Sequence, residues 1–334
     1  MKTNLVDRIN VILIIVSLVL AFIVPFRLFL FSYAVLGPIH YLTEINWLHQ
    51  RNFFVKQRKW IWLFTGGALL ISIPVLLNLP LLSTLNNYSL FNSLNISVTG
   101  LTDVLLLTLF FFSIGLLYLK HWRSILLFLL ASLIMAKLIT KYVLFSYVLV
   151  GLFLPTLVHV YLFTLLFMLM GTLKSKSRMG FVAIFLLVVS PFIIWVFPID
   201  PSFYRNIEPS EAIDTTRNFR FIQQLLLMVN NMGDQLSFAG IRLQMFLAFC
   251  YTYHYLNWFS KTSLIGWHKN ISALKLVVIF ILWASLIVLF WFDYEKAYLA
   301  LFFLALLHIV LEFPLNVASI RSIGASLMAK KKPV

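Results

Sequence analysis

The sequence predicts an all-α membrane protein, a polytopic bundle of about ten transmembrane helices. Three features of the composition predict this fold class: 62% of the 334 residues are hydrophobic, only 11% are charged, and 33 are Phe. A soluble domain of this length needs more charge to cover its surface. The net charge of +15 does not indicate nucleic-acid binding, because the Lys and Arg residues fall in alternate loops, as in membrane proteins.

The predicted spans follow from apolar length, since a helix needs about 20 apolar residues to cross the hydrocarbon layer. In chain order the candidate spans are 9–24, 29–48, 60–82, 102–119, 124–139, 142–173, 179–198, 238–260, 275–292 and 298–318. The stretch 142–173 is too long for one straight span and contains Pro155, which predicts a kinked or partly interfacial helix. We expect residues 1–334 to form a single integral-membrane domain.

The loops sort into two sets by charge. The basic loops, which contain no acid, are 51–59, 120–123, 174–178, 261–275 and 321–332; the opposite loops are 83–99, 199–237 and 293–296. Cytoplasmic loops carry the excess of Lys and Arg, so we expect both termini in the cytoplasm. A multi-pass protein of the bacterial inner membrane is the expected location, with anionic lipids contacting the cytoplasmic face.

The longest predicted extracytoplasmic loop is 199–237. Its first part, 200–216, is polar, and we expect it to be irregular. Its second part, 217–233, pairs two Arg residues with an apolar face, which predicts an amphipathic helix on the outer membrane surface.

Four histidines lie in the middle of long apolar stretches: His40, His159, His254 and His308. An ionisable ring in hydrocarbon costs free energy unless it faces a partner, a cavity or a metal. The four rings fall on predicted spans that all run from outside to inside, so we expect them to share one layer of the bundle. Neutral imidazoles suit iron, zinc or copper, and the sequence therefore predicts these four residues as metal ligands.

Further polar residues follow three of these histidines at helical spacing. Glu44 follows His40, Asn257 follows His254 and Glu312 follows His308, each three or four positions later, which places both side chains on one helix face. A carboxylate there can accept the second ring N–H and fix the tautomer, or bind the metal itself. Tyr41 adds a hydroxyl to the same neighbourhood.

A purely structural interpretation remains open for each histidine. A lone histidine in a transmembrane helix is often neutral and hydrogen-bonded to a neighbouring helix. His159 has no acid or amide three or four residues later. The other histidines, His49, His121 and His268, lie beside cations and Trp residues, which is typical of the membrane interface.

Three short motifs resemble the Brp/Blh family of membrane β-carotene 15,15′-dioxygenases. They are GPIHYLTE at 37–44, FCYTYHYLNW at 249–258 and LLHIVLEF at 306–313. The resemblance implies that His40, His254 and His308 help to hold a single iron that cleaves a double bond with dioxygen. The chain departs from the family pattern: Tyr41 and Glu44 replace the residues that follow the first histidine, and Trp258 stands where the family has another histidine.

Three functions remain open. The first is a non-haem iron dioxygenase or other histidine-liganded oxygenase that acts on a carotenoid or another long apolar lipid. The second is a proton-coupled transporter, in which His and Glu residues at the bilayer middle relay protons. The third is a haem-binding membrane protein. Iron is the expected cofactor, with zinc, copper and haem as alternatives; Cys250, the single cysteine, has no thiol partner for a structural zinc site.

Overall fold

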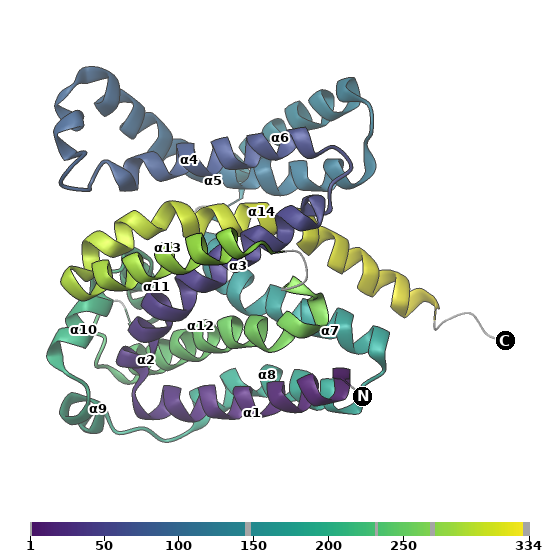
Figure 1. Ribbon diagram of the computed structural model, residues 1–334. Coiled ribbons are helices and arrows are strands. Elements are labelled where there is room, and N and C mark those ends of the chain that lie inside the picture. Colours follow the sequence, from purple (N-terminus) through teal and green to yellow (C-terminus); the bar gives the residue numbers. More distant parts are fainter. Residues whose placement is uncertain (1, 144–147, 231–232, 268–270, 330–334) are drawn as a thin grey trace. The chain divides into compact units, whose positions relative to one another are not determined.

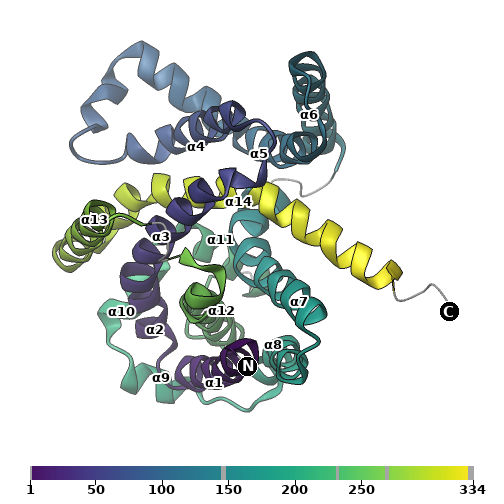
Figure 2. The same ribbon diagram turned by 45° about the vertical axis from the view of Figure 1, so that its right-hand side comes forward.

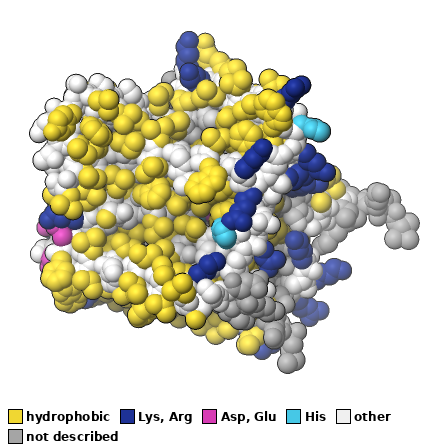
Figure 3. Space-filling model, turned by 45° about the horizontal axis from the view of Figure 1, so that its top comes forward, with side chains coloured by type: hydrophobic (Ala, Val, Ile, Leu, Met, Phe, Trp, Pro, Cys, Tyr) yellow, Lys and Arg dark blue, Asp and Glu magenta, His cyan; other side chains and the backbone are white. Residues whose placement is uncertain are grey.

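The computed structural model describes residues 2–143, 148–230, 233–267 and 271–329, and every regular element in this part is a helix. The predicted all-α fold is confirmed. Nine helices among the described residues are long and apolar enough to cross a membrane, as expected of an integral membrane protein. Figure 3 shows hydrophobic side chains over most of one face, with Lys and Arg gathered along one side of it.

The chain divides into two compact units. The first unit comprises Met1–His40 and Val160–Ile287, and the second comprises Tyr41–His159 and Val288–Val334. The boundaries fall inside three helices: α3 (Gly37–Gln50), η5 (Val148–Phe163) and α13 (Ala273–Phe292). Two of these boundaries coincide with candidate ligands, because His40 and His159 are each the last residue before the chain passes to the other unit.

The central helix of the first unit is α12 (Phe238–Ile265). It is packed by α1 (Lys2–Ile23), α2 (Pro25–Phe31) and α8 (Arg178–Val196), which lie around it in Figure 2. Because neighbouring helices separate most of it from lipid, α12 can carry buried polar residues such as Thr252 and His254. The predicted span 238–260 is therefore a helix, although it is not among the nine membrane-type helices of the described chain.

The second unit is built on a helix pair, α5 (Ser89–Tyr118) and α6 (Trp122–Tyr142). Both α4 (Ile61–Leu76) and α14 (Tyr294–Ala329) pack on α5, and α14 also packs on α4 (Figure 1). A Cβ atom at Gly115 would lie 2.4 Å from the Phe128 ring, so glycine allows α5 and α6 to approach closely. Short 3₁₀ turns connect the spans: η2 (Asn52–Phe54), η3 (Arg58–Trp60) and η4 (Ser83–Asn87).

Basic side chains from different loops meet at one end of the second unit. Lys56 Nζ donates to the Tyr118 carbonyl over 2.7 Å, and the Arg321 guanidinium lies 5.2 Å from the centroid of the Tyr118 ring. Three loops that the charge pattern assigns to the cytoplasm, around residues 56, 120 and 321, thus come together. Arginine over an aromatic ring is typical of the membrane interface.

Two π-helical segments lie next to prolines on the helices that carry His40 and His159. The first, η1 (Ser32–Leu36), ends just before Pro38, and the second, η5, contains Pro155. Proline removes one backbone N–H from the helix, and a wide π turn is one way for the helix to accommodate that loss. The stretch 142–173, for which the sequence predicts a kinked or partly interfacial helix, is from residue 148 on the π-helix η5 followed by α7 (Thr164–Ser175), and residues 144–147 lie outside the described residues.

The segment 200–216 is helical, not irregular as its polar sequence suggested. It forms α9 (Pro201–Ile207) and α10 (Ser210–Arg217). The reason is local capping: Asp200 accepts a hydrogen bond from the Ser202 N–H over 2.9 Å, and Pro201 occupies the first helical position. The next helix, α11 (Arg220–Asn230), packs against α12 and buries Ile222, Leu225 and Leu226 on one face.

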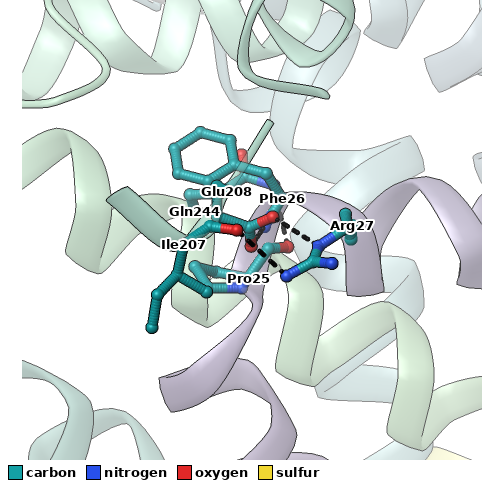
Figure 4. Close-up of polar contacts among 6 residues, drawn as sticks. All are labelled: Pro25, Phe26, Arg27, Ile207, Glu208 and Gln244. Atoms are coloured by element: carbon teal, nitrogen blue, oxygen red, sulfur yellow. Dashed lines mark hydrogen bonds and ion pairs between the residues drawn. The ribbon is translucent and has the colours of Figure 1, made fainter. Parts of the chain in front are cut away.

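Glu208, between α9 and α10, holds the beginning of α2. Its carboxylate accepts from the Phe26 N–H and from Arg27 Nε, both over 3.0 Å, while Arg27 also donates to the Ile207 carbonyl (Figure 4). The Glu208 side chain is fully buried, and the Arg27 side chain is 48% exposed. Because α2, η1 and α3 form a continuous helical run, this contact fixes the start of the span that carries His40.

Candidate metal centre

The first unit brings together His40 from α3 and His254 from α12. Their Nε2 atoms are 3.1 Å apart, and the ring planes meet at 75°. Both side chains are buried. The two histidines therefore point the same ring nitrogen at a common place, although 214 residues separate them in the sequence.

Thr164 orients the ring of His254. Its hydroxyl donates to the Val160 carbonyl over 2.7 Å and lies 2.7 Å from His254 Nδ1. A hydroxyl has one proton, so Thr164 must accept from the His254 Nδ1–H. The Nε2 atom of His254 then carries a lone pair, which is the form of imidazole that binds a metal. No sequence pattern marked Thr164, because a threonine that bonds its own helix is common.

Aromatic rings surround His40 in the first unit. The Tyr255 ring lies 5.1 Å from the His40 ring and the Trp258 ring 5.6 Å from it, measured between centroids. Trp258 follows His254 by one helical turn. At this position the chain therefore supplies an apolar wall and not a further nitrogen ligand.

The second unit brings together His159 from η5 and His308 from α14. Their Nε2 atoms are 2.9 Å apart, and the ring planes meet at 76°. Tyr41 stacks on His308 at a centroid distance of 4.2 Å. This arrangement repeats that of the first unit, with two buried imidazoles facing each other through Nε2.

Glu312 orients the ring of His159 and not that of His308, its neighbour along α14. Glu312 Oε2 lies 3.0 Å from His159 Nδ1, and both side chains are buried. Glu44 is also buried, and its carboxyl group is within hydrogen-bonding reach of Glu312. The His-x-x-x-Glu spacing placed Glu312 beside His308, whereas the structure places it beside His159, because the spacing within one helix cannot show which ring on another helix a side chain meets.

The remaining polar candidates lie apart from these contacts. Asn257 is buried one turn after His254, and among the described residues its Oδ1 atom has no hydrogen-bond partner. His49 is exposed and contacts Arg58, as expected at the interface. His121 is exposed, and His268 lies outside the described residues.

No known protein family matches this chain, and no characterised protein or solved structure is detectably similar to it. The arguments about function therefore rest on the chemistry of the side chains. His40, His254 and His308 are three buried histidines that could hold a metal ion. Imidazole nitrogens together with a carboxylate oxygen suit iron, zinc or copper. The single cysteine, Cys250, is buried and forms no disulfide.

Proposed function

We propose that this chain is an intramembrane metalloprotein in which His40, His159, His254 and His308 bind one metal ion. The two Nε2–Nε2 distances carry the proposal. Two nitrogens that each lie about 2.0–2.1 Å from one ion are about 2.9 Å apart at a right angle and about 3.4 Å apart at a tetrahedral angle. The observed separations of 3.1 and 2.9 Å fall within this range.

The orientation of the outer ring nitrogens also supports a metal centre. His254 Nδ1 meets Thr164, and His159 Nδ1 meets Glu312. Metal-binding histidines usually make such a contact through the nitrogen that does not bind the metal, and it fixes the tautomer and the ring orientation. In both pairs the two Nε2 atoms face each other, as they would toward a shared ion.

Two continuous helical runs carry residues of both histidine pairs. On α3, His40 contacts His254, while Glu44, one turn later, is next to Glu312. Along η5 and α7, His159 contacts His308, while Thr164 contacts His254.

The function we propose for this centre is oxidation of a long apolar lipid such as a carotenoid, with iron as the metal. Bound iron would supply the activation of dioxygen. The protein would supply nitrogen ligands held by Thr164 and Glu312, aromatic walls from Tyr255 and Trp258, and exclusion of bulk water. A substrate that partitions into lipid fits a site on helices in the membrane, and the resemblance of three short motifs to the Brp/Blh family favours the same chemistry.

One observation favours a second function, proton-coupled transport. Glu44 and Glu312 are two buried carboxyl groups in contact, next to His159. Buried acids and histidines at this depth also form proton relays in carriers. The presence or absence of stoichiometric metal distinguishes the two functions.

Metal analysis of the purified protein tests the proposal. Protein extracted in mild detergent from cells supplied with iron is expected to contain about one iron per chain, because the ligands define one centre. Replacement of His40, His159, His254 or His308 by Ala should each reduce the iron content, with helicity unchanged by circular dichroism. His121→Ala should keep the full content. A folded wild-type protein without metal would overturn the proposal, and a haem absorption band would replace it with the haem alternative.

A further inference from the structure

A row of buried polar side chains runs along one face of α14 beyond His308. The row consists of Glu312, Asn316 and Ser319, which are 2%, 1% and 1% exposed. Their spacings of four and three residues put them on the same helix face, one turn apart. A helix that only packed against α4 and α5 would bury apolar side chains along this face, because each buried polar group costs free energy.

Several polar atoms of this row make no well-directed hydrogen bond with the protein. Among the described residues, the hydroxyl of Ser319 makes no hydrogen bond, and the Asn316 amide makes no well-directed one, although it lies within reach of the Glu312 carboxyl group. Glu312 Oε2 lies close to His159 Nδ1 but also makes no well-directed hydrogen bond. Buried polar atoms in folded proteins are almost always satisfied by protein or by ordered water. Water molecules between the helices would satisfy the remaining polar atoms of the row.

His308 and the row together extend over about half of a membrane span. From His308 to Ser319 the helix rises about 16 Å, at about 1.5 Å per residue. This is about half of the hydrocarbon thickness of roughly 30 Å. Arg321, two residues further, lies over the Tyr118 ring at the basic end of the second unit, which marks the interface. The row thus begins at the candidate ligands and ends within one turn of that interface.

We infer that the row Glu312–Asn316–Ser319 is a hydrated route by which a divalent cation reaches the histidines from the cytoplasmic end of α14. This inference rests on the proposed metal centre. A cation cannot cross hydrocarbon without water or protein oxygens around it. Ser319 and Asn316 supply neutral oxygens along the path, and the Glu312 and Glu44 carboxyl groups lie at its inner end. Oxygen ligands exchange easily, and imidazole nitrogens then bind the ion more firmly.

Thiol accessibility tests the route without reference to metal. In a Cys250→Ala background, Asn316→Cys and Ser319→Cys in inside-out vesicles should react with a membrane-impermeant cationic thiol reagent. The matched control is Ile320→Cys, which follows Ser319 on the outward face and is 47% exposed there. It should react more slowly, because its surroundings are lipid. If Asn316→Cys and Ser319→Cys react no faster than the buried Cys250 of the wild type, water does not reach the row and the inference fails.

Loading kinetics test whether the ion uses this route. Metal-free protein in inside-out vesicles is given ferrous iron, and bound iron is measured over time. Ser319→Val and Asn316→Leu should slow loading but reach the wild-type final content, since neither residue is a ligand. Loading at the wild-type rate in both variants would overturn the inference. A wild type that holds no metal while Ser319→Cys is still labelled would overturn the proposed centre and leave the hydrated row in place.

Discussion

Glu312 Oε2 lies 3.0 Å from Nδ1 of His159, a residue on a different helix. This contact gives His159 the orienting acid that its own helix does not provide. It also leaves His308, one turn before Glu312 on α14, with the Tyr41 ring as its stacking partner. The carboxylates therefore connect helices, and the pairing of each acid with a ring is a tertiary property.

Replacement of Glu312 by Gln should weaken metal retention. The carboxylate that lies 3.0 Å from His159 Nδ1 would become a neutral amide, which fixes the imidazole tautomer less well. Losses of this kind typically reduce affinity on the order of 10–100-fold. Competition with a chelator of known affinity measures the change. Glu295→Gln is the matched control, because Glu295 is an exposed acid in the first turn of the same helix. Equal affinity in Glu312→Gln and Glu295→Gln would mean that Glu312 does not orient a ligand.

Thr164→Val should also weaken metal retention, whereas Thr164→Ser should preserve it. Valine keeps the shape of threonine but removes the oxygen that accepts from His254 Nδ1. Serine keeps that oxygen. We expect a loss of affinity on the order of 10–100-fold for the valine variant. Equal metal affinity in the two variants, with both folded, would show that the hydroxyl only bonds its own helix.

Glu208→Ala should destabilise the first unit. It would leave the buried Phe26 N–H without its acceptor and remove the ion pair with Arg27. Loss of a buried hydrogen-bonding partner costs about 1–3 kcal/mol. Thermal unfolding in detergent should show a lowered midpoint. The control is Asp214→Ala, since Asp214 pairs with Arg217 at 3.7 Å across an exposed helix face and such pairs contribute little. A lowered midpoint in the control alone would contradict the role of Glu208.

Topology mapping should place both termini and the loops 51–59 and 174–178 in the cytoplasm. The basic residues of these loops give the physical reason, because translocating them across the membrane is disfavoured. Loops 83–99 and 199–237 should face the other side. Reporter fusions, or cysteine labelling in intact cells compared with inside-out vesicles, measure the sidedness. Labelling of residues 51–59 from outside would reverse the assignment, and with it the direction of the proposed route along α14.

The sequence alone determined the fold class and the approximate helices, because lipid imposes a strict rule on every span. Backbone groups in hydrocarbon must be satisfied within the helix, and about 20 apolar residues must cover the crossing, so length and composition suffice. The same requirement identified the interior histidines, because an ionisable ring is rare within a long apolar stretch of sequence. Hydropathy did not predict the helices α9 and α10, because short helices outside the hydrocarbon depend on capping residues such as Asp200.

Only the tertiary structure decided which side chains meet. Periodicity within one helix places His308 and Glu312 on the same face, yet Glu312 contacts His159, and His254 is oriented by Thr164 from α7. These contacts depend on how each helix is rotated about its axis and how closely it approaches its neighbours. Packing of large and small side chains sets both, as Gly115 against Phe128 illustrates, and that information is spread over residues far apart in the chain.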